Sequence, residues 1–114
     1  MVAAPLLSGC ELVRSEVSKY SGWDVNIIVA ISMAESGCNP ANDNLTTSET
    51  HSTCVGSYGA LQVGCMHYRD GEDRADFATN IRVAHRAYLE RVAMTGNGYT
   101  AWTMYTNGKY REHL

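Results

Sequence analysis

One carboxyl group in this chain occupies a position that would change its chemistry. Glu35 follows an apolar run, residues 26–34, and Gly37 comes two positions later. Apolar side chains recur in the run at helical spacing and also cover much of the remaining circumference, which predicts a buried helix. Asp24 is positioned to be its N-cap and Gly37 to stop it. Glu35 should therefore lie in the last turn of a buried helix.

That placement predicts a function for the carboxyl group of Glu35. The carbonyl end of a helix and apolar neighbours both disfavour a carboxylate, so we expect a raised pKa. A carboxyl group that keeps its proton near neutral pH can act as a general acid and protonate a leaving oxygen. The alternative interpretation is a helix-end glutamate that points into water.

Composition limits the classes of function. The 114 residues carry a net charge of −3, and the basic residues are scattered, so no basic face is expected and nucleic acid is excluded as a partner. No apolar stretch is long enough to span a membrane. No repeat or linker divides the chain, which predicts a single domain over residues 1–114. We expect a soluble monomer that needs no cofactor.

The cysteines indicate a compartment. Cys10, Cys38, Cys54 and Cys65 are four in a small chain, which favours two disulfides and an oxidising environment. Four cysteines allow three pairings, and all three stay open. A zinc site is the competing interpretation, but there is no Cys-x-x-Cys pair and Cys65 stands too close to His67 for a standard finger, so we predict no metal.

The first residues allow two interpretations. Leu6-Leu7-Ser8-Gly9-Cys10 is similar to a lipoprotein cleavage box, but no basic segment precedes it and the apolar stretch is short. Ser8 and Glu11 also have the spacing of a capping box, which would open a helix ending near Gly22. We favour the helix, and a secreted, cell-envelope or periplasmic domain whose export signal is not in this sequence.

The remaining elements are predicted from spacing and turn residues. Between Gly37 and Gly56 the composition favours a loop and a small hairpin, and Tyr58 to Met66 a short helical piece. The later expectations are a charged turn over 70–73, a long amphipathic helix from Asp76 to Gly96 with Arg82, Arg86 and Arg91 on its solvated side, and a last helix over 101–106.

Short motifs of the chain carry a resemblance to a known family. They are Glu35-Ser-Gly, Gly56-Ser-Tyr-Gly-Ala-Leu-Gln-Val63, Asn80-Ile81 with Tyr88-Leu89, and Tyr105-Thr-Asn-Gly108. In order and spacing the chain resembles the lysozyme-like superfamily, closest to soluble lytic transglycosylases and goose-type lysozymes. The resemblance implies a mainly α, α+β fold with a small β-hairpin beside a glycan groove. It also implies cleavage of the β-1,4 bond between N-acetylmuramic acid and N-acetylglucosamine in peptidoglycan.

The resemblance also implies roles for single residues. Glu35 matches the catalytic acid/base, while Ser57, Tyr58 and Gln62 match substrate-binding positions of the groove, and Tyr105 matches a tyrosine close to the catalytic carboxyl. Each has an ordinary alternative.

Gln62 could satisfy backbone groups of the hairpin, and Tyr105 could be a core aromatic paired with Trp102. Asn80 is expected to tie a helix start to a neighbouring loop. Two departures from the family pattern are Thr106, where asparagine is usual, and Ala84, where glycine is usual.

The second carboxylate of many glycosidases is missing from its usual place. Animal-type lysozymes have an aspartate where this chain has Ser57. Retaining hydrolysis needs a second carboxylate about 5 Å from the acid, and inverting hydrolysis needs one somewhat further away. Asp43 and Glu49 are the candidates, and a solvated loop is the alternative for both. If neither reaches the groove, Glu35 alone would transfer both protons and leave a 1,6-anhydro sugar. A catalytically weak glycan-binding or inhibitory module stays open as a different class of function.

Overall fold

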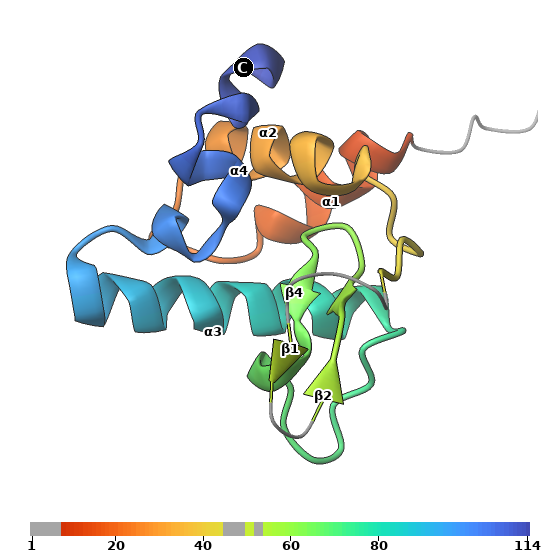
Figure 1. The fold of residues 1–114 in the computed structure, drawn as a ribbon. Coiled ribbons are helices and arrows are strands. Elements are labelled where there is room, and N and C mark those ends of the chain that lie inside the picture. The colour runs from red at the N-terminus through yellow and green to blue at the C-terminus, as the bar shows by residue number, and fades with distance from the viewer. Residues whose placement is uncertain (1–7, 45–49, 52–53) are drawn as a thin grey trace, which may run out of the picture.

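The computed structural model of the protein describes residues 8–44, 50–51 and 54–114. Its α-helices are α1 (Gly9–Val17), α2 (Val25–Ser36), α3 (Phe77–Thr95) and α4 (Thr103–Thr106). Short 3-10 turns are η1 (Cys65–His67), η2 (Gly98–Ala101) and η3 (Lys109–His113). Figure 1 shows α1, α2 and α4 gathered above the long α3, with the strands β1 and β2 extending below it. The prediction of a mainly helical fold with a small β portion is confirmed.

The first two helices begin where their caps predict. The Ser8 hydroxyl accepts a hydrogen bond from the Glu11 amide, and the Asp24 carboxylate accepts from the amides of Asn26 and Ile27. Gly37 ends α2 in the left-handed conformation, at φ 66°. These local bonds satisfy amides that a helix start leaves without partners. α1 ends at Val17 rather than near Gly22, because Ser18 caps it there and its hydroxyl donates to the Arg14 carbonyl.

The core lies between the three longer helices. α2 is almost entirely buried from Ile28 to Ser32, as its apolar circumference predicts. Val13 and Val17 of α1 and Ile81, Val83 and Ala84 of α3 are fully buried against it in the same cluster. Burial of such side chains stabilises the fold by about 1.5–3 kcal/mol each.

The β portion consists of two small antiparallel pairs. β1 (Thr50–His51) pairs with β2 (Cys54–Val55), and β3 (Ser57–Tyr58) pairs with β4 (Val63–Gly64). An isolated bridge joins Asn44 to Ser57 and extends the second pair. The expected small hairpin before Gly56 is therefore present, and a second one follows it.

The predicted helical piece from Tyr58 to Met66 is wrong. The segment is a hairpin because two residues of its turn have positive φ, 75° at Gly59 and 46° at Gln62, which a helix does not allow. Gly59 also packs directly on Asn80, since a Cβ placed there would lie 2.6 Å from the Asn80 side chain. Only glycine permits both the conformation and the close approach.

α3 has the start and stop that the sequence predicts. Asp76 caps it through the Thr79 amide, and Gly96 ends it at φ 81°. The predicted last helix begins two residues later than expected, at Thr103, because Trp102 is extended at φ −115° and ψ 128°. The 3-10 turn η2 occupies the preceding residues.

The expected solvated arginine face of α3 is correct in part. Arg82 and Arg91 are exposed, but Arg86 is half-buried and its guanidinium contacts Glu72 at 2.6 Å. Arg82 also contacts Glu72, at 2.8 Å. Glu72 lies in the turn predicted over 70–73, where its amide bonds to the Arg69 carbonyl. We call Glu72, Arg82 and Arg86 the Glu72 cluster.

The four cysteines form two disulfides, as predicted. The pairs are Cys10–Cys38 and Cys54–Cys65, which resolves the pairing that the sequence left open. Within 8–44, 50–51 and 54–114 no three His, Cys, Asp or Glu side chains gather as a metal site would require. No described helix is both long and apolar enough to cross a membrane.

Candidate active site

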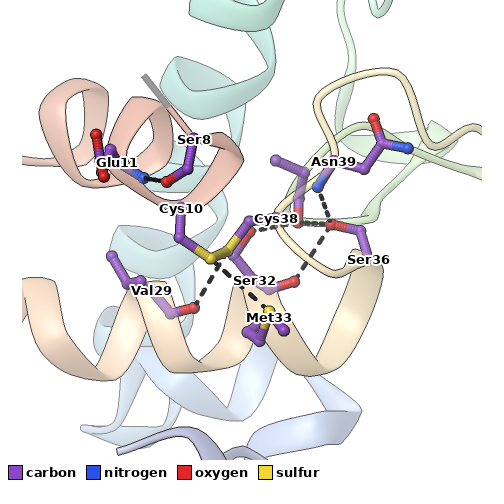
Figure 2. Close-up of a disulfide and its surroundings, with 10 residues drawn as sticks. Ser8, Cys10, Glu11, Val29, Ser32, Met33, Ser36, Cys38 and Asn39 are labelled. Carbon is purple, nitrogen blue, oxygen red and sulfur yellow. Dashed lines mark hydrogen bonds between the residues drawn. A yellow bond between two sulfur atoms is a disulfide. The ribbon is translucent and has the colours of Figure 1, made fainter. Parts of the chain in front are cut away.

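Glu35 lies in the last turn of α2 and is half-buried. The end of the helix is held firmly, because Cys38, in the left-handed conformation at φ 58°, is bonded to Cys10 of α1 (Figure 2). Gly9 lies against the same point, where a Cβ would overlap the Cys38 carbonyl oxygen. The backbone that carries Glu35 is thus fixed to a neighbouring helix within three residues.

The same helix end is bonded to the turn of the β3–β4 hairpin. The hydroxyls of Ser32 and Ser36 both donate to the Ala60 carbonyl, at 2.8 and 2.7 Å. The Trp102 indole N–H donates to the carbonyl of the next residue, Leu61, at 2.8 Å. We call these five residues the helix–turn junction. It places the end of α2, which carries Glu35, next to the turn that carries Gln62.

Gln62 uses its side-chain amide on the backbone. Its Nε2 donates to the carbonyl of Gly59 at 3.0 Å and to the carbonyl of Asn42. The alternative expectation, that Gln62 satisfies backbone groups, is therefore correct. The bond to Asn42 also draws the loop after α2 against the hairpin turn. Gln62 stays half-buried and lines a cavity, so its prediction as a sugar contact stays open.

This cavity, of about 170 Å³, opens beside the helix–turn junction. Three parts of the chain form it: the hairpin turn with η1, the middle of α3, and the start of the last helical segment. The lining residues are Gln62, Val63, Gly64, Met66, His67, Ala87, Arg91, Ala101 and Trp102. Apolar side chains such as Val63 and Trp102 share this lining with the polar side chains of Gln62, His67 and Arg91, so the lining is mixed rather than mainly apolar.

Two predicted sugar contacts are buried. Ser57 is 3% exposed and Tyr58 is 4% exposed. The Tyr58 hydroxyl donates to the Val55 carbonyl and accepts from Arg74, whose guanidinium also lies 4.4 Å from the ring centroid. These contacts stabilise the hairpin. A role of either side chain at a sugar stays a prediction.

Tyr105 belongs to a series of stacked aromatic rings. Its ring centroid lies 5.2 Å from that of Tyr99 and 4.8 Å from that of Tyr110, and its hydroxyl accepts from Asn97. The alternative that Tyr105 pairs with Trp102 is wrong: within the described residues no ring contact joins the two. The Trp102 indole N–H donates to the Leu61 carbonyl instead. Tyr105 is half-buried, and α4, which carries it, packs against α2.

Asn80 ties α3 to the hairpin, as expected. Its Nδ2 donates to the Tyr58 carbonyl at 2.9 Å and to the Tyr68 hydroxyl at 2.7 Å. Its Oδ1 is buried with no hydrogen-bond partner. Asn80 therefore has a structural position behind β3 rather than at the cavity.

Of the two candidate second carboxylates, the structure describes only Asp43. Asp43 is exposed, between Asn42, which Gln62 binds, and Asn44, which pairs with Ser57. Burial raises the pKa of the Tyr68 hydroxyl, and the negative charge of Asp43 adds to this effect. Glu49 lies outside the described residues.

Sequence reasoning missed the residues that hold the site together. Ser32 and Ser36 were not singled out, although a serine inside an apolar helix is a signal for a buried hydrogen bond. The spacing of α3 predicts only a solvated face for Arg91, and nothing in the sequence marks Met66 as a lining residue. No local pattern marks a cavity lined from three distant segments.

Comparison with known proteins gives one finding on the fold. A crystal structure of a lysozyme from Litopenaeus vannamei matches with a TM-score of 0.62 and 22% sequence identity, over 90% of this chain and 86% of that one. No family model and no curated protein matches the sequence. The fold, a helical body with a small β portion, is of the lysozyme type.

Proposed function

We propose that this chain is a peptidoglycan-cleaving glycosidase with Glu35 as its general acid/base. The observation that carries the proposal is the position of Glu35. It lies at the end of a buried helix that two serine hydroxyls bond to the Gln62 turn, in a fold shared with a solved lysozyme. A half-buried carboxyl group at the carbonyl end of a helix has the surroundings that a proton donor needs.

The substrate of the proposed reaction is the β-1,4 bond between N-acetylmuramic acid and N-acetylglucosamine. Glu35 would protonate the glycosidic oxygen as the bond breaks. Gln62 and Tyr105 are proposed as groove residues near the scissile bond, and Ser57 and Tyr58 as residues of the wall behind them. The motifs of the sequence favour the soluble lytic transglycosylase and goose-type lysozyme branch.

Two routes complete the proposed reaction. Asp43, held beside the hairpin by the anchors on either side of it, is the candidate base for a water molecule. Without such a base, Glu35 would take a proton from the muramyl 6-hydroxyl, and this oxygen would attack the anomeric carbon and form a 1,6-anhydro ring. The sugar's own acetamido group and the dipoles of the groove would stabilise the charge that develops in the transition state.

The proposed place of action is outside the cytosol, as one domain that meets glycan strands in the cell wall or envelope. Two disulfides support an oxidising compartment, because glutathione and thioredoxin keep cytosolic thiols reduced.

Digestion of purified cell walls tests the proposal. The intact chain should release muropeptides, and their mass separates the two routes, since a 1,6-anhydro product is lighter by one water than a reducing product. Asp43→Asn should abolish release if water is the nucleophile and leave it unchanged if the 6-hydroxyl is. A chain that binds walls but releases nothing from them would show that the glycan-binding module is the correct class.

A further inference from the structure

We propose that Arg91 makes the cavity beside the helix–turn junction selective for a sugar that bears a carboxylate. Its ligand would be a muramyl unit that carries no stem peptide, so that its lactyl carboxylate is free, in preference to N-acetylglucosamine, which has no carboxylate. The inference rests on the proposed function, because it takes this cavity, which Gln62 lines, as part of the proposed glycan groove.

The position of Arg91 supports this inference first. Ala87 and Arg91 are one helical turn apart on α3, so both side chains lie on the face that lines the cavity. Met66 and Trp102 also line the cavity. The cavity, at about 170 Å³, is smaller than the roughly 300–1,000 Å³ of pockets for drug-sized ligands. One sugar ring or a short branch is the size of occupant that it suits.

The charge of Arg91 supports it second. Its guanidinium makes no ion pair or side-chain hydrogen bond with any residue in the described part of the chain. Arg86, one turn and a half earlier on the same helix, is fully engaged by Glu72 and the His67 carbonyl. No acidic side chain stands among the described lining residues. The cavity therefore presents a cation whose charge is available to a ligand.

The chemistry of the guanidinium favours a carboxylate. Its planar donors match the two oxygens of a carboxyl group and can bind them as a pair. The protein as a whole has a net charge of −3, which disfavours an anionic glycan, so a local cation has more influence on where the glycan settles. The charge of Arg91 does not increase the affinity for a neutral sugar. The selectivity is this difference in affinity between a sugar with a carboxylate and one without.

Two substrates test the inference. Glycan strands stripped of their peptides bear free lactyl carboxylates, and chitohexaose is neutral. We expect Arg91→Gln to raise KM for the stripped strands about three- to ten-fold with kcat nearly unchanged, as the loss of one exposed charge pair implies. KM for chitohexaose should not change. Added salt should reduce the difference between the variant and the unmodified chain.

Matched variants control for charge and folding. Arg111→Gln removes the same charge from η3, outside the cavity, and should leave both substrates unaffected. Arg91→Lys keeps a cation without the paired donors and should recover part of the lost affinity. Equal weakening of both substrates by Arg91→Gln, or no weakening of either, overturns the inference.

A binding measurement separates this inference from the proposed activity. Titration of Glu35→Gln protein with each glycan, followed by Trp fluorescence since Trp102 lines the cavity, reports affinity without cleavage. A loss of affinity for the stripped strands in the Glu35→Gln, Arg91→Gln double variant supports the inference even if the unmodified chain cleaves nothing. No binding of the stripped strands by Glu35→Gln protein overturns it, even if the chain cleaves walls.

Discussion

Two regions fix the β3–β4 hairpin and the turn that follows it to the helices, and they use different chemistry. At the helix–turn junction two hydroxyls and one indole N–H donate to the carbonyls of Ala60 and Leu61, and all the donors are neutral. At the Glu72 cluster one carboxylate lies between the guanidiniums of Arg82 and Arg86. The first region is largely buried, and the second lies near the surface.

The difference has a consequence for the carboxyl group that is proposed to transfer protons. None of the five residues of the junction titrates, so the hydrogen bonds that fix the end of α2 to the hairpin turn do not change with pH. The Glu72 cluster does titrate, because its carboxylate can take up a proton. Neutral hydrogen bonds can fix the backbone beside an acid without shifting the pKa of that acid. Ion pairs at the same place would fix the backbone and also shift the pKa.

The largest expected effect is on catalytic activity, and it should distinguish a carboxyl group beside the junction from one in the Glu72 cluster. Glu35→Gln should lower the rate of muropeptide release about 10²–10⁴-fold, the range typical of a lost general acid. Glu72→Gln makes the same chemical change at the Glu72 cluster and should leave the rate within about two-fold. Turnover of purified walls measures both. Similar losses in the two variants would remove Glu35 from its proposed role.

The two disulfides should stabilise the fold by different amounts: Cys10–Cys38 joins α1 to the end of α2, and Cys54–Cys65 joins the residues on either side of the β3–β4 hairpin. Loss of Cys10–Cys38, with a sequence separation of 28, should cost about 3.6 kcal/mol, and loss of Cys54–Cys65, with a separation of 11, about 2.8 kcal/mol, in the loop-entropy model. Urea unfolding of the paired Cys→Ser variants measures both. A larger loss for Cys54–Cys65 would indicate that native contacts outweigh loop length.

The serines of the junction should act non-additively. Ser32→Ala and Ser36→Ala should each lower the free energy of unfolding by about 1 kcal/mol, because the Ala60 carbonyl keeps one donor in either variant. The double variant leaves this carbonyl with neither donor and should lose more than the sum. A double-mutant cycle by chemical unfolding measures the excess, and strict additivity would show that the two bonds are independent.

The smallest effect is a pH dependence confined to the Glu72 cluster. The hydrogen bond from Arg86 lowers the pKa of Glu72 from its ordinary 4.5 to about 2. Its folded pKa is depressed, so this stabilisation is fully present above pH 4.5 and is lost as the pH falls from there through about 2. Glu72→Gln should cost about 1 kcal/mol at pH 7 and less near pH 2. Thermal unfolding at a series of pH values measures the difference, and a constant cost across that range would contradict it.

Helix ends were the most predictable part of the fold. Asp24, Gly37, Asp76 and Gly96 act through bonds and backbone angles within their own turn, and all four end or begin helices as expected. The hairpin from Ser57 to Gly64 was not predictable as such. Its Tyr58-Gly-Ala-Leu-Gln62 segment lacks a strong turn signal. Its conformation also depends on a hydrogen bond from Asn80 to the Tyr58 carbonyl, and these two residues are more than twenty positions apart in the sequence.

The candidate site was predictable only as a set of motif residues. The sequence singles out Glu35 and Gln62, but it also marked Ser57 and Tyr58, which are buried in the structure. Whether a side chain faces a cavity or the core depends on packing between segments, and local pattern carries no information on it.

By itself, the sequence determined where the helices begin and end, that four cysteines would pair, and which carboxyl group is placed in the last turn of a buried helix. These features depend on neighbouring residues and on the apolar content of one segment. Only the tertiary structure decided the disulfide pairing, the bonds from two serines to one carbonyl, and the placement of Arg91 at the cavity. Each of these joins residues far apart in the chain, and their proximity results from the packing of the whole core.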